Sequence, residues 1–378
     1  MKLQSSLLAM AATSALVSSA YSQTVIDITG STAGRSAVHS QIWALLGTGK
    51  TCAWHTISGS GTSASNADRV IYKGTYGGNA VIIRTYWTGS AAGVRDVSNA
   101  PQINNGYFAT TTDTTAGTTS TGVQITTPVL APASAETVSE IGFSDVFQSS
   151  TPYTTNTLVM DDKVGVIPFK FFKNKGASIK LTNVTPGLHR TLYGALGEAP
   201  LSLFTGDSAD NGTTIYATGR DGDSGTRITC LAETGTGVFA TINQYTGTVT
   251  GGVASLTFVG NGGFASGSGV SGLLKGTYPT GIILGYLGAS DWSTAVSGGA
   301  TELAYNGVTL GANSALIQNG LYSFWGYLHQ SRMTLAGTSL NFYNDLKTNL
   351  LAAPGTGLVL IGTMNVERAA DGAPITPL

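Results

Sequence analysis

Three junctions of the same kind, at which a strand ends in a loop of small residues that opens a helix, most constrain the fold of this chain. The loops are GSTAGRSA (30–37), TGSAAGV (88–94) and DGDSGTR (221–227). Each would place Ser, Thr and Gly at a helix N-terminus, where unpaired backbone N–H groups and the positive end of the helix dipole attract anions. Three such loops together predict that several helix ends meet on one anion.

Strands and helices alternate along the sequence. The pattern predicts buried strands at 80–87, 163–172 and 281–289, and shorter strands at 24–30 and within 139–145. Helical segments separate many of these strands by lengths suited to parallel sheets, which indicates an α/β fold. With 378 residues the chain is long enough for two domains with their own cores.

Composition limits the partners of the protein. The formal net charge is −1, and only 10% of the residues are charged. There is no bulk attraction to nucleic acid or to anionic membranes, so we expect no nucleic-acid partner, and any bound anion must be held by local geometry. The 51 Gly residues, with many Thr and Ser residues, are typical of a secreted protein rich in strands and turns.

Residues 1–22 are typical of a secretory signal peptide. Lys2 gives a positive start, residues 7–17 form a short apolar run, and Ala20 and Ser22 suit the −3 and −1 positions of a cleavage site. The run is too short to span a membrane comfortably, and no later segment offers about 20 apolar residues in a row. We therefore expect a soluble periplasmic or extracellular protein that is not inserted in a membrane.

The segment ALLGTGKT (44–51) fits the pattern of a phosphate-binding loop of nucleotide hydrolases when Ala is allowed at its first position. Such a loop follows a buried strand and opens a helix. Here the order is reversed, because residues 36–46 have apolar residues at helical spacing and GTGK then closes that helix. Lys50 would lie at the negative end of the helix dipole, so we expect no nucleotide there.

The loops, in their order and spacing, resemble those of periplasmic phosphate-binding proteins, the PstS-like substrate-binding proteins of ABC transporters. The clearest match is RDGDSGT (220–226), which has the Arg of that family, three residues, and Ser-Gly-Thr at a helix start. Other segments are similar to the opening loop, the Gly-Ser-Ser-Gly-Gly loop, the Gly-Ala-Ser-Asp strand end and the late motifs of the family. These segments are DITGSTAGRSAVHSQIW (27–43), GSAAGV (89–94), GFSD (142–145), GIILGYLGA (281–289), AYNGVTL (304–310) and IQNGLYSFWGYLH (317–329).

The resemblance implies the type II periplasmic-binding-protein fold, in which two α/β lobes are joined by two crossing strands and close on a ligand. Lobe one would comprise residues 24–165 plus 285–378, and lobe two residues 166–284, with crossings near 165–172 and 281–287. The implied function is the capture of inorganic phosphate, or a related oxyanion, between the lobes for an ABC permease. The resemblance implies no enzymatic activity, and we expect a monomer without cofactor or metal.

The ligand contacts of the family carry over residue by residue. Arg220 would form a charge-assisted hydrogen bond to the oxyanion. Ser224, Gly225 and Thr226 would donate through hydroxyl and backbone N–H groups, and Ser90 would donate from the second loop. Asp145 would accept the proton of monohydrogen phosphate and so reject sulfate, which has no proton near neutral pH.

The first loop departs from the family pattern. Gly34 and Arg35 stand where the family has Thr-Phe, so one hydroxyl donor is lost unless Thr32 or Ser36 replaces it. Arg35 either adds a second cationic contact to the ligand or faces solvent. Two alanines at 91–92 remove a further hydroxyl from the second loop.

A serine protease is an alternative from another class. GDSG (222–225) is similar to the nucleophile motif of chymotrypsin-like proteases, and CAWHT (52–56) is similar to the segment that carries their His. Ser224 and His55 would then belong to a triad. Thr226 stands where the protease has Gly, and the residues after it are helical in pattern. His39, His189 and His329 lack metal-binding spacing.

A third alternative keeps the binding-protein fold in a secreted surface or matrix protein that takes up no phosphate. The long segments 57–79 and 99–138, rich in Gly, Ser and Thr, would suit such a protein, although the sequence assigns them no role. Cys52 and Cys230 are either joined in a disulfide or are two buried free thiols.

Overall fold

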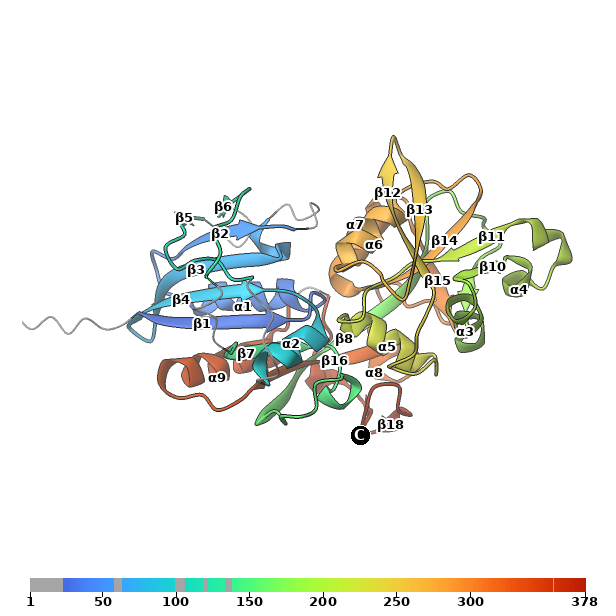
Figure 1. Cartoon of the computed structure of the whole chain (residues 1–378). Helices are drawn as coiled ribbons and strands as arrows, with labels where there is room; N and C mark the ends of the chain where they lie inside the picture. The colour runs from blue at the N-terminus through green and yellow to red at the C-terminus, as the bar shows by residue number, and fades with distance from the viewer. Residues whose placement is uncertain (1–22, 58–62, 99–105, 118–121, 133–137, 356) are drawn as a thin grey trace, which may run out of the picture.

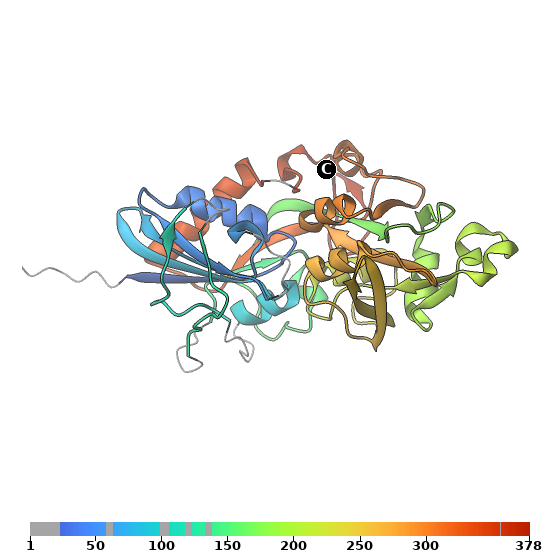
Figure 2. The same ribbon diagram turned by 90° about the horizontal axis from the view of Figure 1, so that it is seen from above.

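The computed structural model describes residues 23–57, 63–98, 106–117, 122–132, 138–355 and 357–378. The predicted signal peptide (1–22) lies outside the described residues, and so do parts of the two long segments 57–79 and 99–138. Figure 1 shows two groups of helices and strands that are joined by the central strands β8 and β16. Figure 2, a view from above, shows that the molecule is elongated along the line through both groups.

One mixed sheet of 14 strands runs through the described part of the chain, with the order β10-β11-β14-β8-β16-β7-β1-β4-β3-β2-β5. β15 also pairs with β8, β6 with β2, and β9 with β15. The strands of the sheet are β1 (Thr24–Gly30), β2 (Thr51–His55), β3 (Arg69–Tyr76), β4 (Asn79–Tyr86), β5 (Thr115–Ala116), β6 (Val123–Gln124), β7 (Ile141–Ser144), β8 (Met160–Lys173), β9 (Asn183–Val184), β10 (Glu198–Pro200), β11 (Thr214–Ala217), β14 (Gly281–Gly288), β15 (Thr301–Tyr305) and β16 (Trp325–Arg332). Two hairpins lie outside it, β12 (Gln244–Thr250) with β13 (Val253–Gly260), and β17 (Val366–Glu367) with β18 (Thr376–Pro377).

The helices pack on both groups of strands (Figure 1). α2 packs on β1 and β7, α9 on α1, β1 and β8, and α6 and α7 pack on each other and on β14. The helices are α1 (Arg35–Leu45), α2 (Ser90–Val97), α3 (Pro186–Gly194), α4 (Ser202–Thr205), α5 (Gly225–Glu233), α6 (Gly267–Leu274), α7 (Ala289–Ser297), α8 (Ala315–Gln318) and α9 (Gly337–Ala352). Within the described ranges, none of the helices has the length and apolar character to cross a bilayer.

Strand β8 belongs to both groups of strands. Its residues 160–168 pair with β16, while residues 169–173 pair with β14, both antiparallel. All of its residues from Val164 to Lys173 are buried. The strand therefore links the two groups directly.

The α/β architecture is confirmed, but the sheet is less parallel than the sequence pattern suggested. β1 pairs in parallel with β4 and β7, and β11 pairs in parallel with β14. β2, β3 and β4 form an antiparallel meander instead, and β3 was not predicted. The missed signal is the pair Gly77-Gly78, whose φ angles of 56° and 81° fit the two-residue turn that joins hairpin strands.

Lys50 follows the C-terminal end of α1, as the sequence predicts. Its ammonium group donates to the carbonyl oxygen atoms of Trp43 (2.5 Å) and Leu46 (3.0 Å) and lies 4.9 Å from the centre of the Trp43 ring. These carbonyls are the ones that a helix end leaves without partners. The lysine therefore closes a helix, which agrees with the rejection of the nucleotide-binding loop.

Both cysteines are free and buried, Cys52 on β2 and Cys230 on α5. This resolves the alternative that the sequence left open in favour of two free thiols. Burial raises the pKa of the Cys52 thiol to about 11 and raises that of the Cys230 thiol as well. Both thiols are thus protonated and shielded.

The predicted lobe bounds, 24–165 plus 285–378 and 166–284, remain a prediction. The strand pairing indicates that the chain returns to lobe one later than residue 285, because the elements that follow this residue still lie beside β14 and the last residues of β8. β15 pairs with β8 and β9, and α7 packs on α6. The chain returns to β7 only with β16.

Candidate oxyanion site

The three predicted loop-and-helix junctions are present in the structure. β1 leads through Gly34 into α1, β4 leads through Gly89 into α2, and the loop after β11 leads through Ser224 into α5. Ser224 is the N-cap of α5, where its hydroxyl oxygen accepts from the backbone N–H of Arg227 at 3.3 Å. A Ser at this position satisfies one of the unpaired donors of the first turn.

Asp145, directly after β7, is the residue at which two of these junctions meet. The Ser90 hydroxyl at the start of α2 donates to Oδ1 of Asp145, and the Thr226 hydroxyl at the start of α5 donates to Oδ2 at 3.3 Å. The backbone N–H of Asp145 in turn donates to Oγ of Ser90 at 3.1 Å. The structure thus brings together Ser90, Asp145 and Thr226, which are far apart in the sequence.

Two glycines allow this close approach. A Cβ atom on Gly225 would overlap the carboxylate of Asp145 and the hydroxyl of Ser90. Gly89 has a φ of 112°, and a Cβ atom on it would lie 2.5 Å from the carbonyl oxygen of Asp223. That carbonyl accepts from the backbone N–H of Ala91 at 3.0 Å, so the starts of α2 and α5 are in direct contact.

Burial raises the pKa of Asp145 to about 6. Its own backbone N–H, the guanidinium of Arg220 and the hydroxyl of Thr226 oppose this effect, while Asp371 adds to it. The carboxyl group is therefore mainly ionised at neutral pH and acts as a hydrogen-bond acceptor. The carboxyl group gains its proton when the pH falls below about 6.

Arg220 is 2% exposed and lies next to this cluster. Its Nε donates to the carbonyl of Phe264 at 3.0 Å, and its Nη2 donates to the carbonyl of Ala265 at 2.8 Å and to Oγ1 of Thr32 at 3.4 Å. Across the described ranges, no carboxylate forms an ion pair with Arg220. A buried guanidinium held by neutral groups is an attractive position for an anion, because buried charges are ordinarily paired.

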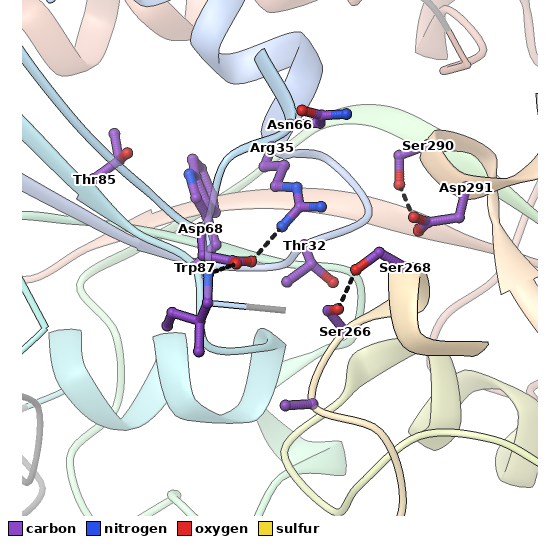
Figure 3. Close-up of polar contacts among 12 residues, drawn as sticks. Thr32, Arg35, Asn66, Asp68, Thr85, Trp87, Ser266, Ser268, Ser290 and Asp291 are labelled. Carbon is purple, nitrogen blue, oxygen red and sulfur yellow. Dashed lines mark hydrogen bonds and ion pairs between the residues drawn. The ribbon is translucent and has the colours of Figure 1, made fainter. Parts of the chain in front are cut away.

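Arg35 is also buried, with 3% exposure, so the alternative in which it faces solvent is wrong. Its Nη1 donates to Oδ1 of Asp68 at 2.7 Å. Figure 3 shows this ion pair beside Thr32. Gly34 turns its Cα toward the core, since a Cβ atom there would lie 2.8 Å from Cδ1 of Leu328. The binding roles of Arg35 and Gly34 stay predictions.

Asp291 and Asp68 are polar residues near the arginines that the sequence reasoning missed. Asp291 lies in the first turn of α7 and is 7% exposed. Burial raises its pKa, and the charges of Arg35 and Arg220 oppose this shift. A signal was present, because GASD (288–291) repeats the pattern of GFSD (142–145) after a buried strand. Asp68 precedes β3, the strand that was not predicted.

The protease alternative finds no support in the geometry. Ser224 caps α5, and His55 at the end of β2 bonds through Nδ1 to the carbonyl of Ile125 at 2.7 Å. β2 and α5 lie in different groups of elements in Figure 1. Over the ranges that the structure covers, no set of three or more His, Cys, Asp or Glu side chains is arranged to hold a metal ion.

A pocket of about 430 Å³ lies beside strands β1 and β4. Asp27, Arg84 and Glu140 line it together with small and apolar residues. Its charges are already paired, because Arg84 binds both carboxylate oxygens of Asp27 and the backbone N–H of Asp27 donates to Glu140 at 2.8 Å. This pairing makes the pocket a weaker candidate for an anion than the surroundings of Arg220.

Glu140 should make the stability of the protein depend on pH. Burial, with the nearby charge of Asp27, raises its pKa from 4.5 to about 7. The folded state therefore holds a proton that the unfolded state has lost, and the free energy of unfolding contributed by this group falls as the pH rises from about 4.5 through about 7. Urea unfolding at several pH values should show that Glu140→Gln removes this fall. An identical pH profile for the variant would contradict the assignment.

The fold and the position of the loops define a class, the two-lobed α/β proteins with the type II periplasmic-binding-protein fold. No family model matches the chain, and no curated protein matches it. Among solved structures, the chain is similar to one assigned as a phosphate ABC transporter substrate-binding protein with bound phosphate, from Clostridium perfringens. The match covers 89% of this chain and 100% of that one, with 13% identity and a TM-score of 0.51.

A second solved structure, an ABC-type phosphate transport receptor from Vibrio cholerae, matches 88% of this chain and 99% of its own, with 12% identity and a TM-score of 0.47. The Clostridium match shows that this chain has the fold of a substrate-binding protein, and the resemblance seen in the sequence motifs is confirmed at that level. The Vibrio match is too distant to add to this conclusion.

Proposed function

We propose that this protein is a secreted substrate-binding protein that captures inorganic phosphate between its two lobes and passes it to an ABC permease. The observation that carries the proposal is the buried Arg220, held by neutral groups next to the point where the starts of α2 and α5 meet. Amide donors at two helix starts and one guanidinium are what an oxyanion requires. The neighbour from Clostridium, which has the same fold, was solved with phosphate.

Isothermal titration with phosphate, arsenate, sulfate and molybdate tests the proposal. We expect phosphate and arsenate to bind, because each carries a proton for Asp145 near neutral pH, and sulfate to bind more weakly. The absence of heat with all four anions, confirmed by unchanged thermal unfolding in their presence, would refute the proposal.

Asp145→Asn should reduce the discrimination between phosphate and sulfate. The amide of Asn can donate to a sulfate oxygen, whereas the ionised carboxylate only accepts and repels. We expect sulfate affinity to rise and phosphate affinity to fall, so that their ratio decreases by about tenfold or more, as is typical when one charged hydrogen bond changes. Asp207→Asn, at an exposed carboxylate between α4 and β11, is the matched control. If the ratio of phosphate to sulfate affinity equals that of the wild-type protein, Asp145 does not discriminate between the two anions.

The alternative of a secreted structural protein is favoured by one specific observation. The hydroxyls of Ser90 and Thr226, which would donate to phosphate, both donate to Asp145. The carboxylate of Asp145 would then accept the hydrogen bonds of these two hydroxyls in place of a bound anion. In that case Asp145→Asn would lower the free energy of unfolding while no oxyanion raised it.

A further inference from the structure

A second group of buried polar side chains adjoins Arg220, whose Nη2 donates to Oγ1 of Thr32 at 3.4 Å. Figure 3 shows Arg35 and Thr32 facing Ser266, Ser268 and Asp291, which come from the starts of α6 and α7. All five are at least nine-tenths buried. The start of α1 thus lies opposite the starts of α6 and α7, which are far from it in the sequence.

Arg35 has a donor that the protein leaves unused. Its Nη1 binds Asp68, but its Nε atom is buried and has no hydrogen-bond partner in the part of the chain that the structure describes. Leaving a buried donor without a partner costs about 1–3 kcal/mol, so such an atom in a folded protein points to a partner that is absent from the chain itself. The missing group must be a hydrogen-bond acceptor.

Asp291, by contrast, can accept a further hydrogen bond. Its Oδ2 accepts from the Ser290 hydroxyl at 3.0 Å, and within the described ranges its carboxylate forms no ion pair. Burial raises the pKa of Asp291, whereas Arg35 and Arg220 are near enough to oppose this shift and Asp68 is near enough to add to it, yet neither arginine forms an ion pair with the carboxylate. In its ionised form, which the two arginines favour, this carboxylate only accepts, so the group that fits here is a hydrogen-bond donor.

We propose that Arg35 and Asp291 extend the oxyanion site, and that the ligand carries a second hydrogen-bond donor, which Asp291 accepts. This inference rests on the proposed function. Phosphate oxygens would take the free donor of Arg35 and the guanidinium of Arg220, Asp145 would accept the first donor, and Asp291 the second. The second donor is either the second proton of dihydrogen phosphate or a hydroxyl or ammonium group on a phosphomonoester.

The competing explanation is that Asp291 only balances the charges of the two arginines. A purely balancing carboxylate would affect stability, and it would affect all phosphoryl ligands alike. A carboxylate that accepts a ligand donor would instead set the preference among ligands that differ only in that donor. The preference is therefore the quantity to measure.

The test is calorimetric titration with matched ligands. Phosphoethanolamine carries a donor that methyl phosphate lacks, and phosphate itself is compared at about pH 8 and about pH 6.5, between which its second proton is gained. We expect the wild-type protein to prefer either phosphoethanolamine over methyl phosphate, or phosphate at the lower pH, by about tenfold, which corresponds to about 1.4 kcal/mol. The first outcome identifies an organic ligand and the second identifies dihydrogen phosphate.

Asp291→Asn should remove that preference, while Asp113→Asn, at an exposed carboxylate, should keep it. If thermal unfolding shows that Asp291→Asn does not fold, Asp291→Glu, which keeps the charge and moves the carboxylate, should show the same loss. A wild-type protein without either preference, or an Asp291→Asn protein that retains it, overturns the inference. Binding of phosphate without preference overturns only this inference, whereas a lack of binding to every phosphoryl compound also overturns the proposed function.

Discussion

Replacing Arg220 by alanine is expected to weaken phosphate binding by more than tenfold, a loss of about 1.5–3 kcal/mol. The guanidinium is 2% exposed, and carbonyl groups of the neighbouring loop hold it beside Asp145. Hydrogen bonds to charged groups are the strongest that the site can offer, and their removal also leaves the anion without a compensating charge. Titration calorimetry with phosphate measures the effect.

Two further variants separate loss of charge from loss of structure. Arg220→Gln keeps amide donors for the carbonyls of Phe264 and Ala265 but removes the charge, so it should fold normally and still lose most of the affinity. Arg190→Ala removes an exposed arginine and should bind like the wild type. Unchanged affinity in a folded Arg220→Gln protein would place the oxyanion elsewhere.

The second large effect concerns stability. Arg84→Met is expected to lower the free energy of unfolding by about 3–5 kcal/mol, because it leaves the carboxylate of Asp27 buried without its partner. Arg84 Nε and Nη2 donate to the two carboxylate oxygens of Asp27 at 2.7 Å and 2.6 Å, and its Nη1 donates to the carbonyl of Phe108 at 3.0 Å. The two residues are direct neighbours on the parallel strands β1 and β4.

The double variant Asp27→Leu with Arg84→Met provides the control. When both charges are replaced by apolar groups, no uncompensated charge stays behind, and buried pairs treated in this way are often as stable as before. We expect urea unfolding to show recovery of most of the loss. A single variant that loses less than about 1 kcal/mol, or a double variant that loses more than the single one, would contradict this account of the pair.

The sequence could predict those parts of the fold and site that depend on local chemistry. Gly225 is required beside Asp145, and Ser224 caps α5, so both leave a readable pattern of small residues before a helix. Lys50 likewise had to follow a helix end rather than open a helix. In each case neighbours along the chain decide the structure.

Other features depend on residues that are far apart and leave no such pattern. For Arg35 the sequence leaves open whether the side chain contacts the ligand or faces solvent, because nothing near it in the sequence reveals its partner Asp68. Burial excludes only the second of these alternatives. The unpredicted strand β3 hides this partner, since Asp68 directly precedes β3 and is paired with Arg35 at the start of α1. The pair Gly77-Gly78 would have revealed the hairpin, and with it the antiparallel part of the sheet.

The continuity of β8 has a mechanical consequence. Because residues 160–168 are hydrogen-bonded to β16 and residues 169–173 to β14, each half of the strand must move with a different neighbour. A change in the angle between the lobes would then be a torsion of the backbone near Pro168 rather than a sliding of one sheet past another. Hydrogen exchange should accordingly be fastest, among the central strands, at the amides around that residue, and slow on both sides of it.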